Sequence, residues 1–289
     1  MARVGTKTEK PTVSLIGLGR LGQALAMALD SAGYPLQALV GRSDKDGVDD
    51  FARLPPSQLF LITTSDDAIA EVAARLAVAK KGRAKQTVLH TSGALSSAAL
   101  LPLAEAGWHT GSLHPLVSVS EPRAGAKALR GAFYCVEGDR TALSVARSLV
   151  KSLHGRSFSI KTESKALYHA AAVMASPHLV ALFDLATELL VTSGVDKRTA
   201  REILLPLVAS TVKNLAAFNA EQALTGTFAR GDVTTVKRHL EALSAPELGT
   251  AREIYKLLAL HSVQLAAQNG VDPQLLKQIK QLLVDVRPS

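Results

Sequence analysis

The sequence predicts an α/β protein in which a doubly wound, mostly parallel sheet is followed by an all-α second domain. Up to about residue 161, short apolar runs alternate with helix-forming runs, as in sheets whose parallel strands are connected by helices. Beyond that point the pattern is almost entirely helical. We therefore expect a loose tail at residues 1–10, a sheet domain at residues 11–161 and a helical domain at residues 162–289.

The predicted strands of the first domain are short runs rich in apolar and β-branched residues. They lie at residues 12–16, 36–40, 59–63, 87–91, 108–113, 133–136 and 157–160. Helices are predicted between them, at residues 21–32, 66–80, 96–106 and 141–153. Gly33 suits the position just after the C-terminus of the helix at residues 21–32. Asp66 or Asp67 can cap the N-terminus of the helix at residues 66–80.

The second domain is predicted to contain long helices. They lie at residues 164–192, 196–218, 233–243 and 246–268, with a last helix from residue 273. Pro177 and Pro206 are expected to kink two of these helices. Asp272 precedes a proline, a combination that is typical of a helix start.

Composition narrows the class of protein. Hydrophobic residues make up 47% of the 289 residues and charged residues 20%, which is typical of a globular chain. The net charge of +8 is mostly spread along the sequence, and aromatic residues, at 4%, leave few rings on which bases could stack. The charge therefore favours anionic small ligands, and nucleic-acid binding is the weaker alternative.

Several residue patterns bear on the cellular compartment of the protein and on whether it has membrane segments or metal sites. The single cysteine, Cys135, allows no intrachain disulfide, which fits a reducing compartment. The N-terminus has no apolar signal-peptide core, and no uninterrupted apolar run approaches the length of a membrane helix. We expect a cytoplasmic protein with no membrane or nucleic-acid partner. The eight histidines show no metal-ligand spacing, so no metal site is expected.

A glycine motif follows the first predicted strand at once and opens the first helix. It reads Gly17-Leu18-Gly19-Arg20-Leu21-Gly22. The first glycine permits a tight turn, the second lets a pyrophosphate approach the backbone, and the third lets the helix pack on the strand. The helix N-terminus then offers free N–H groups to phosphates. The motif in this context predicts a dinucleotide-binding Rossmann domain; an ordinary glycine-rich turn is the alternative.

The end of the second strand bears on which dinucleotide binds. A site that prefers NAD places an acidic residue there to bind the ribose hydroxyl. This chain has Arg42 and Ser43 instead, and a guanidinium with a hydroxyl suits a 2′-phosphate. The sequence therefore favours NADP over NAD, although a plain surface arginine would look the same.

Two further strand ends should face the cofactor, because ligands bind beyond the carboxyl ends of parallel strands. Thr64 and Ser65 follow one strand, and Thr91, Ser92 and Gly93 follow another. Hydroxyl groups and a glycine there offer hydrogen bonds and room for a flat ring. Helix capping for the first pair and a simple turn for the second group are the alternatives.

Three basic side chains are candidates for catalysis. His114 ends another strand, and Lys165 and His169 lie four residues apart on one face of the first helix of the second domain. Hydride transfer to a carbonyl develops negative charge on oxygen, which a lysine or histidine can stabilise and protonate. An exposed lysine and two structural histidines are the alternative.

Several segments together resemble a family of bacterial proteins that join a Rossmann-like NADP-binding domain to a helical C-terminal domain of unknown function. It is part of the 6-phosphogluconate-dehydrogenase-like superfamily, with ketopantoate reductase, pyrroline-5-carboxylate reductase and deazaflavin-dependent NADP reductase. Besides the glycine motif, the resemblance rests on residues 90–93, 112–116, 165–170 and 223–232 with His239.

The resemblance implies a homodimer formed through the helical domain and an active site between the two domains. Lys165 looks like the lysine of ketopantoate reductases, but His169 stands where that family has an asparagine. Ser176-Pro177-His178 departs from the family pattern in the same way. Asn214 and the Thr225-Gly226 turn are expected to contact the substrate; a helix cap and an ordinary loop are the alternatives.

The leading hypothesis is an NADP-dependent oxidoreductase that transfers a hydride to or from a carbonyl or imine of a small, anionic metabolite. In it Lys165 is the main proton donor or oxyanion stabiliser, and His169 and His114 orient the substrate or relay the proton. One alternative is an NADP-binding sensor or scaffold without turnover, because a fold alone does not define an activity. A ketopantoate reductase-type enzyme is the other.

Overall fold

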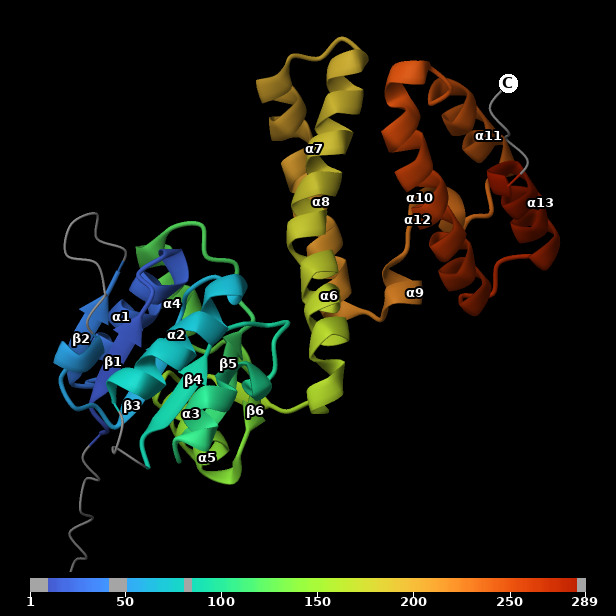
Figure 1. Ribbon diagram of the computed structural model, residues 1–289. Helices are drawn as coiled ribbons and strands as arrows, with labels where there is room; N and C mark the ends of the chain where they lie inside the picture. Colours follow the sequence, from blue (N-terminus) through green and yellow to red (C-terminus); the bar gives the residue numbers. More distant parts are fainter. Residues whose placement is uncertain (1–9, 42–50, 81–84, 285–289) are drawn as a thin grey trace, which may run out of the picture. The chain divides into compact units, whose positions relative to one another are not determined.

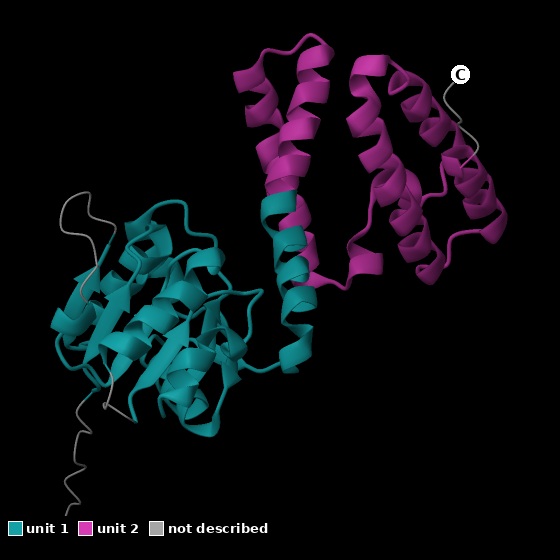
Figure 2. Cartoon of the chain, viewed as in Figure 1, with its two compact units in different colours: residues 1–178 teal, residues 179–289 magenta. Residues whose placement is uncertain are grey.

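The computed structural model describes residues 10–41, 51–80 and 85–284. The chain divides into two compact units, residues 1–178 (unit 1) and residues 179–289 (unit 2), which Figure 2 shows in two colours. Unit 1 contains the sheet and the first long helix after it. The predicted domain boundary at residue 161 stays a prediction: it falls where the sheet has ended, whereas unit 1 continues through one more helix.

Unit 1 is built on a sheet with the strand order β2-β1-β3-β4-β5-β6-β7 (Figure 1). Strands β1 to β5 are parallel, β6 runs antiparallel to β5, and β7 runs parallel to β6. This confirms the predicted doubly wound, mostly parallel sheet. The strands are β1 (Val13–Ile16), β2 (Leu36–Val40), β3 (Leu59–Ile62), β4 (Thr87–His90), β5 (His109–Pro115), β6 (Phe133–Gly138) and β7 (Arg156–Phe158).

Helices of unit 1 connect the strands, as the alternating pattern predicts. An unpredicted helix, α4, begins at a proline, and the carboxylate of Glu121 caps it by accepting hydrogen bonds from two backbone N–H groups. The helices are α1 (Arg20–Ser31), α2 (Asp66–Ala79), α3 (Leu101–Glu105), α4 (Pro122–Leu129), α5 (Arg140–Ser152) and α6 (Lys165–Ala175), with short 3₁₀ turns η1 (Phe51–Arg53), η2 (Ser97–Leu100) and η3 (Thr162–Ser164).

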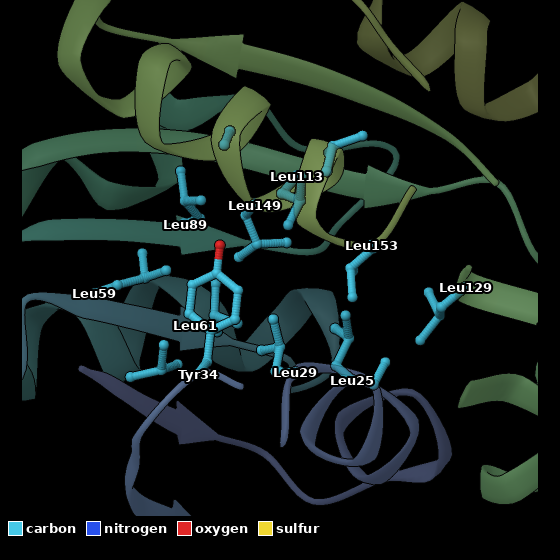
Figure 3. Close-up of a cluster of buried hydrophobic side chains, with 14 of the residues drawn as sticks. Leu25, Leu29, Tyr34, Leu59, Leu61, Leu89, Leu113, Leu129, Leu149 and Leu153 are labelled. Carbon is cyan, nitrogen blue, oxygen red and sulfur yellow. The ribbon is translucent and has the colours of Figure 1, made fainter. Parts of the chain in front are cut away.

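The sheet carries a hydrophobic core on each face. Every residue of β1, β3 and β4 is buried, which explains why these strands are continuous apolar runs instead of alternating ones. Figure 3 shows one core, in which Leu25 and Leu29 of α1 lie among leucines of the sheet and of α5. Helices α2 and α3 contribute to the other core, which includes Phe60 and Trp108. With both faces covered, the strand ends are left as the place for a ligand.

Unit 2 is helical. Its compact part is formed by three helices whose buried residues, among them Val236, Val263 and Ile279, make one cluster. The first helix, α7, starts at the end of unit 1. The helices are α7 (Pro177–Thr192), α8 (Lys197–Ala217), α9 (Ala220–Ala223), α10 (Gly226–Ala229), α11 (Val233–Ala242), α12 (Gly249–Gln268) and α13 (Pro273–Val284), with a 3₁₀ turn η4 (Pro246–Leu248).

The two prolines that were expected to kink helices behave differently. The predicted helix at residues 164–192 is interrupted at Ser176, whose backbone leaves the helical region (φ −129°, ψ −77°) just before Pro177. Pro206 instead lies inside α8, which continues past it. The short helices α9 and α10 were not predicted, because four residues are too few to show a helical period.

Two long helices bury very little of their surface. Within the described chain, Thr187 is the one buried residue of α7 and Ala200 the one buried residue of α8. Many of their large apolar side chains are exposed. Those exposed on these two helices include Val180, Val191, Ile203, Leu205, Leu207, Val212 and Leu215.

One stretch of the described chain corrects an expectation from the sequence. Thr162–Thr192 is long and apolar enough to cross a membrane by length and composition, with a hydropathy of 1.4 over its most apolar window, of which 6% is buried. No such run was expected, since the polar residues and the proline within it break its apolar appearance. On its own such a stretch is weak evidence for a membrane span, because helices of soluble proteins pass the same test.

Candidate functional site

The glycine motif forms the turn between β1 and α1, as predicted. Gly17 has a φ of +106°, and a Cβ on it would lie 2.7 Å from the backbone of Thr63 and Thr64 at the end of β3. A Cβ on Gly22 would collide with the carbonyl oxygen of Gly17. Both positions therefore require glycine, because the helix start, the turn and the neighbouring strand pack together without room for a side chain.

Gly19 differs from these two glycines, since no described residue has an atom within 4 Å of the place where its Cβ would be. It is the N-cap of α1 and is exposed. Of the described residues, none caps this helix with a side chain, and its first turn contains no acidic residue. Arg20 begins the helix with its side chain exposed, while Leu18 and Leu21 pack against the core. An uncapped helix N-terminus offers free N–H groups to which an anion can bind.

Thr64 contributes the clearest unmet polar group of this edge. Its Oγ1 is buried and has no hydrogen-bond partner among the described residues. A buried hydroxyl without a partner costs free energy, so a ligand that bonds to it would be favoured. Ser65, also predicted to contact the cofactor, precedes α2 as its N-cap and makes no side-chain cap hydrogen bond. Together with the open helix end, this arrangement fits a dinucleotide.

The turn after β4 is held by internal hydrogen bonds. Ser92 Oγ donates to Asp66 (2.9 Å) and accepts from the N–H groups of Ala94 and Leu95. The buried His90 accepts from the N–H of Ser92 at Nδ1 (3.2 Å), and its Nε2 lies 3.0 Å from the carbonyl of Ser96. Burial lowers the pKa of His90 to about 4, so the ring is neutral and donates to that carbonyl. The predicted cofactor residue Ser92 thus also builds the turn, while the hydroxyl of Thr91 donates to the carbonyl of Ile62 in β3 (3.5 Å).

Gly93 lies at the tip of this turn, beneath two imidazole rings. A Cβ on Gly93 would collide with the ring of His169 and would lie 2.8 Å from Nε2 of His114. The two rings are edge to face, with centroids 5.7 Å apart. His114 also bonds through Nδ1 to the hydroxyl of Tyr168 (2.6 Å). Unit 1 therefore brings together both predicted histidines and a tyrosine that the sequence analysis did not assign.

Burial and charge hold His114 neutral. Desolvation, followed by the nearby ammonium of Lys165 and then by His169, lowers the pKa of His114 to about 4. The hydroxyl of Tyr168 is half-buried, and desolvation raises its pKa. Both groups are therefore uncharged near pH 7 and act as hydrogen-bonding groups.

Lys165, the first residue of α6, lies near the same turn and is almost completely buried, with 2% of its surface exposed. Its ammonium donates to the carbonyl of Ser92 and to Oγ of Ser112, each at 3.1 Å. Burial lowers its pKa, against the opposing effects of Cys135 and of the carboxylate of Glu137. Ser112 stands between the two charges, because its hydroxyl lies 3.4 Å from Glu137.

Glu137 is a functional group that the sequence analysis missed. It is 7% exposed and accepts hydrogen bonds from the N–H and hydroxyl of Ser97, at 2.8 and 2.6 Å. Thr162, just before α6, is 3.4 Å away. The sequence signal that could have identified it is a carboxylate directly after the apolar run of β6. A buried acid is rarely left without a cationic partner, so a buried Glu137 would have predicted a nearby lysine or arginine.

A cavity of about 380 Å³ lies between the end of β5 and α6. His114 and His169 are its polar wall, with Ser118 and Ser176, and its other side is apolar. None of the described lysines or arginines lines it. The remaining lining residues are Pro115, Leu116, Val117, Ala172, Val173, Ala175 and Pro177.

The other predicted site residues stay predictions. Arg42 and Ser43 lie outside the described residues. Asn214 lies on α8, and Thr225 is the N-cap of α10, where the exposed Gly226 has a φ of +77°. These three residues belong to unit 2. Among the described residues, no three or more His, Cys, Asp or Glu side chains gather as metal ligands would.

Comparison with protein-family models defines the class of this protein. Residues 2–115 match the Rossmann-like domain, and residues 132–262 match a domain of unknown function, DUF2520. The chain is therefore a Rossmann-like protein with a helical C-terminal region, and it carries a DUF2520 domain, as its resemblance to that family implied.

Solved structures share this fold along most of the chain. A Bacteroides fragilis protein described provisionally as an NADP oxidoreductase has 21% identity and a TM-score of 0.71, covering 87% of this chain and 97% of its own. A Thermotoga maritima protein has 21% identity and a TM-score of 0.71, with 89% and 99% covered. Plasmodium falciparum pyrroline carboxylate reductase with NADP bound has 11% identity and a TM-score of 0.57, with 95% and 98% covered. A search of curated sequences found no match.

Proposed function

We propose that the protein is an NADP-dependent oxidoreductase that transfers a hydride between the nicotinamide and a carbonyl or imine of a small metabolite. The observation that carries the proposal is the continuous edge from the uncapped start of α1, past the unpartnered hydroxyl of Thr64, to the histidines over Gly93. Such an edge offers phosphate-binding N–H groups at one end and proton-bearing groups at the other. Similarity in fold to reductases supports it.

The residues of unit 1 would hold the cofactor as follows. The N–H groups of the turn from Gly17 to Gly22 would bind the pyrophosphate, and Thr64 would donate to or accept from the bound cofactor. Arg42 and Ser43 would bind a 2′-phosphate, and this supports NADP over NAD. When bound, the nicotinamide supplies the hydride. His114, His169 and Lys165 supply the polar environment around the reacting group.

Gly19 allows a clean test of this proposal, because a Cβ there would meet none of the described residues. We expect wild-type protein to bind NADPH more tightly than NADH in fluorescence titrations. Gly19→Asp should weaken NADPH binding at least a hundredfold, because its carboxylate would repel the pyrophosphate and accept the free N–H groups. Unfolding of this variant by urea should match that of wild type.

Gly249→Ala is the matched control, because Gly249 also has open space around its Cβ position but lies at the start of α12. It should leave the affinity for NADPH unchanged. If neither nucleotide binds wild-type protein, the cofactor assignment is wrong. If NADPH binds but none of a broad panel of carbonyl and imine compounds is reduced, the sensor or scaffold alternative takes its place.

We also propose that a second copy of the chain covers the apolar surfaces of α7 and α8, giving a homodimer. Support comes from the amount of exposed apolar surface on two helices that bury one residue each. Surfaces of this kind mark an interaction site. In this proposal the partner is protein and not lipid, and the protein is cytoplasmic.

Leu205, an exposed leucine of α8, is a suitable position to test the dimer. Light scattering during gel filtration should give twice the chain mass for wild type. Leu205→Glu should lower the association constant by about a hundredfold or more, because it places a charge in an apolar interface. Lys213→Glu changes the charge of an exposed position on the same helix and should keep the dimer. A monomeric wild type at micromolar concentration, or a chain that sediments only with membranes, would contradict the proposal.

A further inference from the structure

The question left open by the site is which side chain meets the substrate. Lys165 is the expected proton donor, but its geometry points to another role. It is 2% exposed, is absent from the described lining of the cavity, and already donates to two protein oxygens. One of these, Ser112 Oγ, leads on to the carboxylate of Glu137. Lys165 is thus committed to a buried network that joins α6 to β4, β5 and β6.

His114 has the opposite character. It lines the cavity, and its Nε2 stands over Gly93, where the absence of a side chain leaves room for the ring. The geometry of the other ring nitrogen decides which proton it carries. Nδ1 lies 2.6 Å from the hydroxyl of Tyr168, so one of these two atoms donates to the other.

The chemistry of the two groups decides the direction of that hydrogen bond. A phenol hydroxyl is a stronger donor than a neutral imidazole N–H, and an imidazole nitrogen is a stronger acceptor than a phenol oxygen. The tyrosine hydroxyl therefore donates to Nδ1 of His114. A neutral imidazole that accepts at Nδ1 has its single proton on Nε2.

We propose that Tyr168 fixes His114 as the neutral Nε2–H tautomer, and that this N–H is the group that donates a hydrogen bond to the reacting atom of the substrate. This inference rests on the proposed oxidoreductase function and deepens it. His114 is then the catalytic residue, and Tyr168 and Lys165 are positioning residues.

The tautomer also restricts the substrate class. A neutral donor pairs with an atom that has a free lone pair, so the reacting group is a carbonyl or an unprotonated imine, and not a protonated iminium ion. The cavity adds an apolar wall and no described cationic side chain, which favours a substrate whose body is apolar beside the reacting group.

The proposal can be tested without cofactor or substrate by nitrogen NMR of protein labelled with ¹⁵N in histidine, at pH 7. His114 should be neutral, with its proton on Nε2. Tyr168→Phe keeps the ring and removes the hydroxyl, so it should give a mixture of the two tautomers. A His114 that carries its proton on Nδ1, or that is doubly protonated at pH 7, would overturn the proposal.

A second tyrosine–histidine pair supplies the matched control. In unit 2, the hydroxyl of Tyr255 lies 2.9 Å from Nδ1 of His239, and the histidine is exposed. Tyr255→Phe removes the same group from the same kind of contact, but it should leave the signals of His114 and the turnover rate unchanged. An altered tautomer of His114 in Tyr255→Phe would contradict the proposal that the hydroxyl of Tyr168 fixes this tautomer.

Kinetics with the best carbonyl substrate of the panel give the second readout. His114→Ala and Tyr168→Phe should lower kcat, by about a hundredfold for the first, with an unchanged Kd for NADPH. His114→Gln retains an N–H near Nε2 and should recover part of the rate. Full activity in folded His114→Ala would overturn the proposal. Failure of NADPH to bind wild type would overturn the proposed function instead, and the NMR result would still decide the tautomer.

Discussion

Units 1 and 2 both contain apolar segments, but these segments are buried to very different extents. The four apolar residues of β3 are completely buried, whereas α7, in which nearly half of the residues are leucine or valine, buries one threonine. The strands of unit 1 are covered on both faces by helices of the same chain. The helices α7 and α8 have no such cover within the described residues. This difference is the basis of the proposed homodimer, in which a second copy of the chain covers α7 and α8.

Polar groups show the same contrast. The ionisable groups inside unit 1 have partners: Lys165 and Glu137 share the hydroxyl of Ser112, and His114 pairs with Tyr168. In unit 2, the comparable contact between His239 and Tyr255 is exposed. A partner that is buried can set a protonation state, whereas an exposed one competes with water. The following predictions test this contrast, beginning with the largest expected effect.

Removal of the buried charge should damage unit 1 most. Lys165→Met keeps the volume of the side chain but removes the charged donor from the buried carbonyl of Ser92 and hydroxyl of Ser112, which should cost about 3–5 kcal/mol. Urea unfolding followed by Trp108, the single tryptophan and a buried residue of unit 1, would measure this. Adding Glu137→Gln should recover a substantial part of the loss. Lys213→Met, at an exposed position of α8, should have almost no effect. A loss below 1 kcal/mol for Lys165→Met would contradict the importance of the buried network around Lys165.

Acidification should weaken unit 1 through its neutral histidines. The pKa of His90 is lowered to about 4 in the folded chain, from about 6.5 when unfolded. Between these values the unfolded chain binds more protons, so stability falls as the pH decreases from about 6.5 to about 4. The loss attributable to His90 is about 3 kcal/mol. Its measure is the difference between wild type and His90→Gln in urea unfolding at pH 7 and pH 4.5.

The same comparison should be made with His261→Gln, which changes an exposed histidine of α12. Its unfolding free energy should follow that of wild type at both pH values. If wild type and His90→Gln lose stability equally on acidification, the imidazole of His90 is not the neutral group that the structure indicates.

Helix caps should show the smallest difference between the units. Asp139 accepts from the N–H groups of Thr141 and Ala142 at the start of α5, and also from the N–H of Thr110 in β5. Asp196 caps α8 alone and is exposed. We expect Asp139→Ala to cost about 2 kcal/mol and Asp196→Ala about 1 kcal/mol, measured by calorimetry. Equal costs would show that the bond to the strand adds nothing.

The fold could be predicted largely because its signals are local. Strands β1, β3 and β4 are short runs rich in apolar and β-branched residues, and the glycine motif is recognised from six consecutive residues, although the contacts that require Gly17 come from Thr63 and Thr64. Helix α4 escaped prediction because it is eight residues long, which is too short for a helical pattern to be recognised with certainty. The break at Ser176 was anticipated at the following proline, but the different outcome at Pro206 depends on packing that no local pattern contains.

The site was predictable only in part, because its partners are distant in sequence. His114 and His169 were identified from their positions at a strand end and on a helix. The roles of Tyr168 and Glu137 depend on contacts across 54 and 40 residues, which spacing does not show. For Lys165, the residue type suggested chemistry, but burial decides whether the ammonium can reach a ligand, and burial is a property of the folded unit.

The thiol of Cys135 has a practical consequence for experiments on this chain. It is the single cysteine, it is completely buried in β6, and burial raises its pKa, so it reacts poorly with alkylating reagents while unit 1 is folded. Its rate of modification therefore reports how often β6 becomes accessible. A mass increase of one label per chain, followed over time, would time the opening of unit 1 with no engineered probe.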